Sequence, residues 1–211
     1  MKTNFTPLVS IVIPTYNHGN YIGKAIKSLI NQTYQNWEAV IIDNHSTDQT
    51  YQEIKNYSDS RIKYFEINNN GVIAKSRNYG ISISKGDWIA FLDSDDWWEK
   101  NKLQKCTNLI NNKVDLIYHD LLIQSYNKSI LTRKLIKSRK LQKPILIDLL
   151  ENGNAISNSS VIVRKKILKK VGLINESKEL VAAEDYNTWL KIADLTNQFL
   201  YLPEILGYYF M

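Results

Sequence analysis

The sequence has little cysteine and no long hydrophobic run. Cys106 is the single cysteine, so the chain cannot form an internal disulfide scaffold. A membrane-spanning helix needs about 20 consecutive apolar residues, whereas the longest clean runs here are strand-sized, as in residues 9–13. Residues 1–5 lack the long apolar segment and the small-residue cleavage site of a signal peptide. These absences argue against a chain that crosses a bilayer, and they lead us to expect a cytoplasmic protein.

Composition and length favour one globular domain. The chain has 211 residues, of which 44% are hydrophobic and 23% charged, as in soluble globular proteins rather than disordered or fibrous ones. It has no internal repeat and no Pro/Gly-rich linker, so we expect a single domain over residues 1–211. The net charge of +6 favours an anionic partner, which could be a membrane surface, a phosphorylated ligand or nucleic acid. The alternative explanation for the excess of basic residues is a general enrichment of Asn, Lys and Ile in the sequence, without any anionic partner.

The N-terminal half alternates strand patterns with helix patterns. Short apolar, β-branched runs predict strands, and apolar residues at helical spacing predict the helices between them. The strands are expected over residues 9–13, 39–42, 62–67 and 88–92, and the helices over residues 21–31, 49–56 and 72–84. Successive βα units of this kind form a doubly wound, mainly parallel central sheet flanked by helices. The sequence therefore predicts the α/β fold class.

Polar segments follow three of these strands, at the point where each strand ends. They are residues 14–17, 43–48 and 93–96. Ligands of open α/β sheets bind at the carboxyl ends of the strands. We therefore expect the three segments to converge on one crevice.

The C-terminal half has a less regular pattern. Strands are expected near residues 116–118 and 160–163, and a helix over about 183–194. Residues 128–143 contain several Lys and Arg residues and no acid, and they predict a mobile loop or irregular helical excursion. With the lysines of residues 164–170, this stretch fits peripheral contact with an anionic membrane or with the phosphate of a lipid-linked acceptor. A solvated basic surface explains it equally.

Asp93, Asp95 and Asp96 form the sharpest chemical signal. Three carboxylates within four residues at a strand end repel one another unless a cation or hydrogen-bond donors compensate them. Mg²⁺ and Mn²⁺ prefer oxygen ligands and keep positions open for substrate phosphates. The cluster therefore predicts a divalent metal site, with a solvated loop that caps the next helix as the alternative.

Six motifs resemble those of glycosyltransferase family 2, and they occur in the family's order. They are the P-x-Y-N end of the first strand in residues 9–17, the Q-T segment in residues 29–34, a D-D-G-S-T-D-x-T-like segment in residues 43–50, G-x-x-x-A-R-N-x-G in residues 71–80, the DXD region in residues 91–96, and E-D-x-x-x-W-L in residues 183–190. Together they cover nearly the whole chain. One departure is that Asn44 and His45 replace the second Asp and the Gly of the third motif.

The resemblance implies a fold and a reaction. Enzymes of this family have the GT-A fold and transfer a sugar from a nucleotide donor with inversion at the anomeric carbon. By this resemblance, residues 7–112 form the nucleotide-sugar-binding half and residues 113–211 an irregular acceptor-binding half. The implied function is a hexosyl- or N-acetylhexosaminyl-type transferase of polysaccharide or glycoconjugate biosynthesis.

The resemblance also assigns residues to the nucleotide-sugar donor. They are Pro14, Thr15, Tyr16, Asn17, Asp43, Asn44, Arg77, Asp93 and Ser94. Tyr16 is expected beside the nucleobase, and Arg77 is expected to contact the diphosphate or to brace the carboxylates. Asn44 can still accept a hydrogen bond from N3–H of uracil and donate one to O4. A UDP-sugar is therefore the favoured donor.

The metal ligands and the catalytic residues follow in the same way. Asp95 is expected to bind Mn²⁺ or Mg²⁺, with Asp93 beside it and Asp96 as a possible helper. A metal on the diphosphate stabilises the charge of the leaving group. Asp185 matches the family's general base, which takes the proton of the acceptor hydroxyl, and Glu184 would orient the acceptor or that base. Without the resemblance, both acids would be explained by stabilisation of a helix N-terminus.

Two other classes remain open at this stage. A sugar-nucleotide nucleotidyltransferase also has a nucleotide-binding α/β fold, but it usually carries a glycine-rich basic loop after its first strand. A basic nucleic-acid-binding module fits the charge, but the acidic cluster at residues 93–96 argues against it. A P-loop and a G-x-G-x-x-G fingerprint are both absent. We expect a saccharide or a lipid-linked saccharide as the acceptor, and no nucleic acid.

Overall fold

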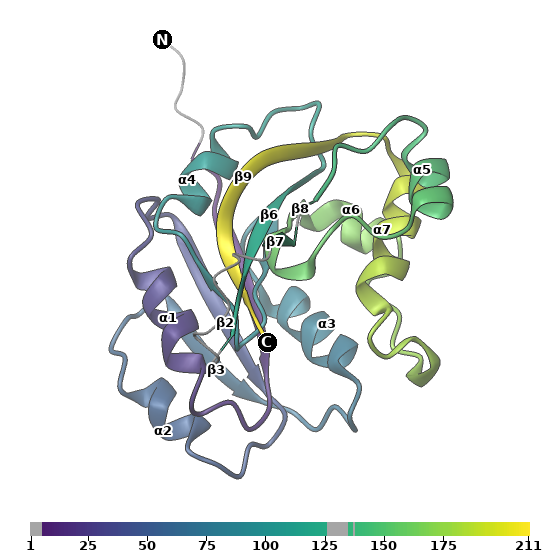
Figure 1. The fold of residues 1–211 in the computed structure, drawn as a ribbon. Coiled ribbons are helices and arrows are strands. Elements are labelled where there is room, and N and C mark those ends of the chain that lie inside the picture. Colours follow the sequence, from purple (N-terminus) through teal and green to yellow (C-terminus); the bar gives the residue numbers. More distant parts are fainter. Residues whose placement is uncertain (1–5, 126–134, 137) are drawn as a thin grey trace.

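The computed structural model of the chain describes residues 6–125, 135–136 and 138–211. Its centre is a nine-stranded sheet in the order β3-β2-β1-β4-β8-β6-β9-β5, with β7 paired to β6. Helices cover both faces of this sheet (Figure 1). The doubly wound α/β arrangement expected from the sequence is confirmed.

The first four strands form the parallel half of the sheet. They are β1 (Val9–Thr15), β2 (Trp37–Asp43), β3 (Ile62–Glu66) and β4 (Trp88–Phe91). The connecting helices are α1 (Ile22–Ile30), α2 (Thr50–Lys55) and α3 (Ile73–Ile83). β1 lies between β2 and β4, with Val12 opposite both Val40 and Phe91. All four predicted strands and all three predicted helices of this half are confirmed.

Alternate residues of β1 pack into two separate cores. Val9, Ile11 and Ile13 face α1, α2 and α4 (Lys102–Thr107), where Cys106 is also buried. Val12 faces the opposite core, with α3. A Cβ at Gly80 of α3 would lie 2.6 Å from Val12 Cγ1, so glycine allows α3 to approach the sheet this closely. The period-two alternation of a strand buried on both faces explains the continuous apolar run in the sequence.

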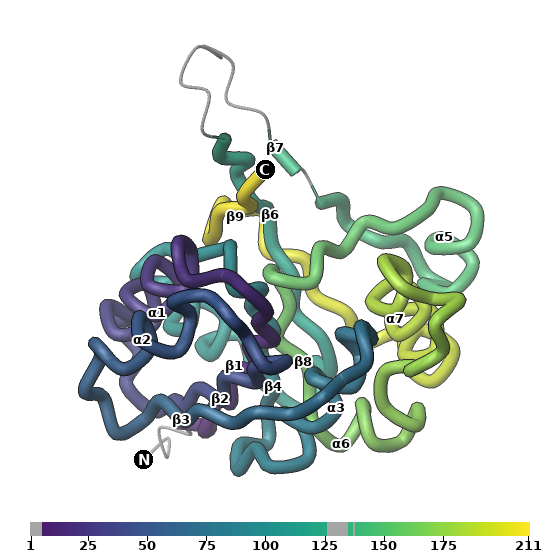
Figure 2. The backbone as a smooth tube through the Cα atoms, turned by 90° about the horizontal axis from the view of Figure 1, so that it is seen from below, coloured from purple at the N-terminus to yellow at the C-terminus, as the bar shows by residue number. Residues whose placement is uncertain are grey.

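The second half adds strands of mixed direction. They are β5 (Trp97–Trp98), β6 (Leu116–Gln124), β7 (Leu135–Ile136), β8 (Ile162–Arg164) and β9 (Phe199–Phe210). The helices are α5 (Ile145–Asn152), α6 (Lys165–Lys170) and α7 (Glu184–Leu195), with short 3₁₀ turns at η1 (Asn158–Ser160) and η2 (Lys178–Leu180). β8 is antiparallel to β4 and β6, whereas β9 is parallel to β6. Figure 2 shows α5 and α7 side by side at the edge of the molecule.

The long strand β9, which crosses the molecule in Figure 1, is not predicted by the sequence pattern. Pro203 lies inside it, and proline cannot donate to a strand ladder. The structure accommodates Pro203 at an irregularity, because the pairing passes from His119–Leu202 directly to Asp120–Ile205. The helices α5 and α6 are also additions to the predicted elements. Half of the predicted mobile segment at residues 128–143, namely residues 128–134 and 137, lies outside the described part of the chain.

The acidic segment between β4 and β5 is anchored at both ends. Leu92, directly after β4, donates its backbone N–H to the carbonyl of Val12 at 3.2 Å. At the other end, Trp97 of β5 pairs with Tyr208 of β9. Along the sheet, β8, β6 and β9 separate β4 from β5. The segment therefore joins two strands that have no partner in common.

Candidate functional site

Two cavities meet at the carboxyl ends of the parallel strands. The first, which we call the strand-end cavity, has a volume of about 410 Å³ and is lined by Pro14, Thr15, Tyr16, His18, Asn44, Asn69, Gly71, Ile73, Asp93, Ser94, Asp95 and Tyr209. It includes residues that follow β1, β2 and β4, as the topology predicts. The second, which we call the α7 cavity, also has a volume of about 410 Å³ and is lined mainly by residues 154–159, by the start of α7 and by Arg77, Asp93, Asp96 and Tyr209.

In the strand-end cavity, Tyr16 and Asn44 lie where a planar ligand could bind. The Tyr16 side chain is 53% exposed, so its ring is available for stacking. Asn44 Oδ1 already accepts a hydrogen bond from the Asn69 backbone N–H at 2.8 Å. That oxygen retains a second lone pair. His18 holds the opposite side of the cavity through a 2.7 Å hydrogen bond between its Nδ1 and Ser94 Oγ.

Asp43 and Asn17 shape the loops of this cavity without lining it. The fully buried Asp43 carboxylate accepts hydrogen bonds from the backbone N–H and the hydroxyl of Ser46 and from the hydroxyl of Tyr64. Asn17 has a positive φ of 51°, and its Oδ1 accepts a 2.8 Å hydrogen bond from the Thr47 N–H. Both side chains are occupied by neighbouring loops, so direct contact of either with a nucleotide stays a prediction.

Arg77 lines the α7 cavity and binds Asp93, which lines both cavities. Its side chain is buried, and it donates one hydrogen bond to Asp93 Oδ1 at 2.8 Å and another to Glu184 Oε1 at 2.6 Å. Asp93 Oδ1 also accepts from Asn158 Nδ2 at 3.1 Å. A guanidinium presents a rigid planar fork of donors, so this contact fixes the end of β4 against the start of α7. In this arrangement Arg77 braces the carboxylates, which is one of the two roles that the sequence left open.

Asp185 lies in the α7 cavity at the first turn of α7. Burial raises the pKa of its carboxyl to about 6; the charges of Glu184 and Asp93 add to the rise, and a hydrogen bond from the Tyr186 N–H and the charge of Arg77 oppose it. A carboxyl group with such a pKa is largely ionised at neutral pH and is still a stronger base than an exposed aspartate. Asp185 can therefore accept a proton inside the cavity.

The three aspartates of the acidic segment have different surroundings. Asp95 lines the strand-end cavity, Asp96 lines the α7 cavity, and Asp93 lines both. Asp96 is buried, and its Oδ1 accepts from the Phe210 backbone N–H at 2.9 Å. Burial, followed by the charge of Asp93, raises the pKa of Asp96 to about 8 and also raises that of Asp95. Each carboxyl would be more fully ionised beside a cation.

A divalent metal fits this donor set only in part. Over the described ranges, no group of three or more His, Cys, Asp and Glu side chains is arranged to hold a metal ion. Asp95 and Asp93 nevertheless offer carboxylate oxygens to the strand-end cavity, and Asp96 Oδ2 is a buried oxygen without a hydrogen-bond partner in that part of the chain. One or two carboxylates suit Mg²⁺ or Mn²⁺ when phosphate oxygens and water complete the coordination.

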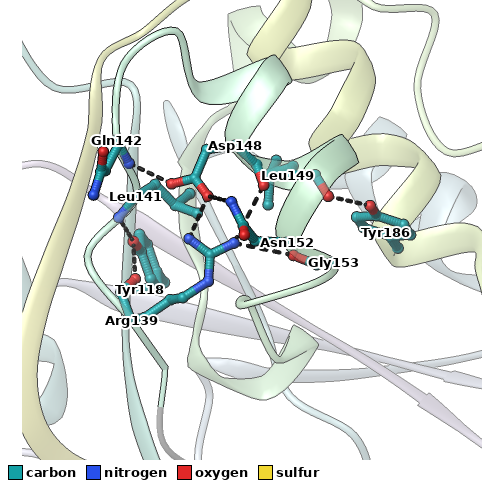
Figure 3. Close-up of polar contacts among 9 residues, drawn as sticks. All are labelled: Tyr118, Arg139, Leu141, Gln142, Asp148, Leu149, Asn152, Gly153 and Tyr186. Atoms are coloured by element: carbon teal, nitrogen blue, oxygen red, sulfur yellow. Dashed lines mark hydrogen bonds and ion pairs between the residues drawn. The ribbon is translucent and has the colours of Figure 1, made fainter.

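A polar network holds α7 in place behind the α7 cavity. Figure 3 shows Arg139 in an ion pair with Asp148 of α5, whose carboxylate also accepts a hydrogen bond from Asn152 at 2.9 Å. Tyr186 of α7 donates its hydroxyl hydrogen to the Leu149 carbonyl of α5 at 2.6 Å. Tyr186 follows Asp185 directly, so the position of the Asp185 backbone depends on how α5 is held.

Sequence reasoning did not identify several lining residues. They are His18, Asn69, Gly71, Ile73, the residues 154–159 and Tyr209. The Asn-rich turn at residues 68–71 and the polar run Ser157–Ser160 were visible in the sequence as signals. Tyr209 carried no signal, because it reaches the cavities through β9, which the pattern did not predict.

The sequence of the chain is similar to those of known glycosyltransferases. Residues 10–172 match the sequence model of the family described as glycosyl transferase family 2. The chain is 33% identical over 186 residues to Escherichia coli WfgD, named UDP-Glc:alpha-D-GlcNAc-diphosphoundecaprenol beta-1,3-glucosyltransferase; the match covers 88% of this chain and 69% of that protein. It is 34% identical over 198 residues to the uncharacterized glycosyltransferase RT0329 of Rickettsia typhi, which covers 90% of this chain and 60% of that protein. A Rickettsia felis relative is matched over 32% of its length, so the chain spans less than two thirds of both Rickettsia proteins.

Solved structures share the fold. Staphylococcus aureus TarS 1–349 in complex with UDP aligns with a TM-score of 0.75 and 26% identity, over 96% of this chain and 60% of that chain. The mannosyltransferase PcManGT of Pyrobaculum calidifontis aligns with a TM-score of 0.73 at 18% identity, over 98% of this chain and 57% of that chain. At this low identity the alignment shows that the two proteins share a fold, and nothing more. The GT-A fold expected from the sequence is thereby confirmed.

Proposed function

The chain belongs to glycosyltransferase family 2, and from this premise we propose that it transfers a hexosyl or N-acetylhexosaminyl group from a UDP-sugar to an acceptor hydroxyl, with inversion. The observation that carries the proposal is the meeting of two cavities at Asp93, one suited to a nucleotide and the other containing a half-buried carboxyl group of raised pKa. Membership of this family favours a glycosyltransferase over the two other classes that the sequence left open, a sugar-nucleotide nucleotidyltransferase and a nucleic-acid-binding module.

The donor is proposed to occupy the strand-end cavity. Pro14, Thr15, Tyr16 and Asn44 would border the uridine, with Asp43 and Asn17 fixing the loops behind them, and Asp93 and Ser94 would lie nearer the ribose and diphosphate. The TarS structures that align at 25–26% identity include complexes with UDP and UDP-GlcNAc, which supports a UDP-sugar here. Its sugar would then point toward Asp93 and the α7 cavity.

The acceptor is proposed to enter the α7 cavity. There Asp185 would take the proton of the attacking hydroxyl while the bond between the anomeric carbon and the diphosphate breaks. Glu184 and Arg77 would hold Asp93 and the start of α7 at a fixed separation. Attack from the side opposite the diphosphate inverts the anomeric centre.

A divalent cation, Mn²⁺ or Mg²⁺, is proposed to bind at Asp95 and Asp93, with Asp96 behind them. When bound, it would neutralise the charge that develops on the diphosphate. The unpartnered Oδ2 of Asp96 and the raised pKa values of Asp95 and Asp96 support a cation at this place.

The acceptor class is proposed to be a saccharide, free or lipid-linked, in polysaccharide or glycoconjugate assembly. The name of E. coli WfgD specifies a diphosphoundecaprenol-linked acceptor for that protein. None of the helices in the described ranges is both long and apolar enough to cross a membrane. We propose peripheral contact with an anionic membrane on the cytoplasmic side, which the net charge of +6 would favour.

Isothermal titration with UDP, GDP and dTDP, with and without Mn²⁺, tests the donor site. We expect UDP to bind in a metal-dependent way, and we expect Asp95→Ala to weaken it at least about tenfold, since the variant removes a carboxylate ligand of a hard cation. Asp87→Ala, which changes an exposed aspartate before β4, is the matched control. If no nucleotide binds to the wild type with any metal, the proposed function is wrong.

A further inference from the structure

Tyr209 lies at the boundary between the two cavities. It is one of two residues, with Asp93, that line both the strand-end cavity and the α7 cavity. The Tyr209 side chain is 37% exposed, and in the described ranges its hydroxyl has no hydrogen-bond partner. A large side chain at this place borders any ligand that extends from one cavity into the other.

The backbone around Tyr209 is held on both sides. Phe210 donates its N–H to Asp96 Oδ1 at 2.9 Å, and Met211 donates its N–H to the Gln124 carbonyl at 2.9 Å. Tyr208 and Phe210 point to the other face of β9, where their rings lie 5.1 Å and 6.5 Å from that of Trp97. Because successive side chains of a strand alternate, this aromatic packing directs Tyr209 toward the cavities.

The phenol of Tyr209 remains a hydrogen-bond donor at neutral pH. Burial raises its pKa, and the charges of Asp96, Asp95, Asp93 and Asp185 raise it further. The four carboxylates near Tyr209 are hydrogen-bond acceptors, and the Tyr209 hydroxyl is a hydrogen-bond donor among them. Its ring supplies an apolar surface, and the C–H face of a pyranose packs on such a surface while its hydroxyl groups need polar partners.

On this geometry, and resting on the proposed function, we propose that Tyr209 binds the transferred sugar of the donor, with its ring against the sugar and its hydroxyl donating to a sugar oxygen. The uridine is proposed to lie at the Tyr16 end of the strand-end cavity, whereas Tyr209 lies at the boundary with the α7 cavity, where the transferred sugar would follow the diphosphate. The side chain therefore discriminates between a nucleotide and a sugar nucleotide, and it sets which sugars fit at the passage to the α7 cavity.

Calorimetric titration of UDP, UDP-glucose and UDP-N-acetylglucosamine, each with Mn²⁺, tests this inference on Tyr209→Phe and Tyr209→Ala. We expect the Kd of a sugar nucleotide to rise about tenfold in Tyr209→Ala and about threefold in Tyr209→Phe, since one loses ring and hydroxyl and the other only the hydroxyl. The Kd of UDP stays within twofold of the wild-type value. Tyr79→Phe and Tyr79→Ala change a tyrosine of 38% exposure that lies outside both cavities, and they serve as controls.

The outcomes separate the two proposals. Unchanged sugar-nucleotide affinity in Tyr209→Ala overturns the inference and leaves the donor site intact. Equal weakening of UDP and of the sugar nucleotides also overturns it, because Tyr209 would then act on the whole cavity. Failure of the wild type to bind UDP overturns the proposed function and this inference together. Tyr209→Phe keeps the shape of the side chain, so its UDP affinity reports whether the cavity has kept its structure.

Discussion

At the scale of single residues, Asp185 shows how an ordinary side chain acquires a new property from its position. An aspartate in a first helical turn needs no catalytic explanation. Here, however, burial raises its pKa to about 6, and Arg77 holds the neighbouring Glu184 through a 2.6 Å hydrogen bond. The combination of a raised pKa and a braced neighbour is what distinguishes a candidate base from a helix-capping acid.

The pH dependence of transfer follows from this pKa. A general base must be ionised, so we expect kcat/KM to fall about tenfold per pH unit below pH 6 and to be level above it. Asp185→Asn removes the base and should lower kcat by about 10²- to 10⁴-fold, with the affinity for UDP unchanged. Initial rates with a UDP-sugar between pH 4.5 and 8 measure both effects.

The control for this prediction is Asp194→Asn, which changes an exposed aspartate near the other end of the same helix. It should leave the rate and its pH profile unchanged. A wild-type profile without an acid limb, or an Asp185→Asn variant with full activity, would show that another group takes the proton.

At the scale of elements, α5 and the segment before it position the start of α7. The Asp148 carboxylate binds Arg139, Asn152 and the Gln142 backbone N–H, and these hydrogen bonds outweigh burial, so the pKa of Asp148 is lowered. A carboxylate with a lowered pKa stabilises the fold at neutral pH and loses that contribution as the pH falls through the folded-state pKa. The network is therefore weakest in acid.

We expect Asp148→Ala to reduce the free energy of unfolding by about 2 kcal/mol at pH 7, since it leaves Arg139 and the Gln142 N–H without their acceptor. The difference from the wild type should shrink toward pH 3, because below about pH 4 the Asp148 carboxyl binds a proton in the unfolded chain, whereas its lowered pKa disfavours that proton in the folded protein. Urea denaturation at both pH values measures it. Glu151→Ala, on an exposed position of the same helix, should change the stability little; an equal loss in both variants would contradict the role of the network.

At the scale of the whole molecule, one buried charge opposes folding. Lys102 is fully buried, and its Nζ, which lies 3.5 Å from the centre of the Trp98 ring, has no hydrogen-bond partner in the described ranges. Burial lowers its pKa from 10.5 to about 7. Between these values the unfolded chain binds a proton that the folded protein does not bind. Stability should therefore rise with pH from about 7 to about 10.5.

Lys102→Met should raise the melting temperature at pH 7 and remove most of this rise, because methionine fills a similar volume without a charge. Calorimetric melting curves between pH 7 and 10 measure the slope. Lys100→Met, at an exposed position two residues earlier, leaves the slope as it is in the wild type. A wild-type protein whose melting temperature does not change over this range would show that Lys102 is protonated throughout.

The sequence predicted local features better than distant ones. The strands β1 to β4, the helices between them and the convergence of residues 14–16, 44 and 93–95 follow from hydrophobic period and from parallel topology. The strand β9 did not follow, since Pro203 interrupts its pattern and only the pairing with β6 shows that the ladder tolerates it. The position of Tyr209, the hydrogen bond from Tyr64 to Asp43 and the hydrogen bonds of Arg77 depend on residues far away in the chain, which no local pattern contains.

The anchoring of the acidic segment has one more consequence. A free loop with three carboxylates relaxes by spreading them apart in solvent, and it must be reordered when a ligand binds. Here β4 and β5 fix both ends of the segment, and Ser159 Oγ and the Phe210 N–H hold it between them. The segment is therefore already ordered, and burial together with the charge of Asp93 raises the pKa values of Asp95 and Asp96. A counter-ion that binds there would stabilise the ionised carboxylates without any ordering of the chain. The sheet thus spares this edge the entropy cost of ordering a loop when a cation binds.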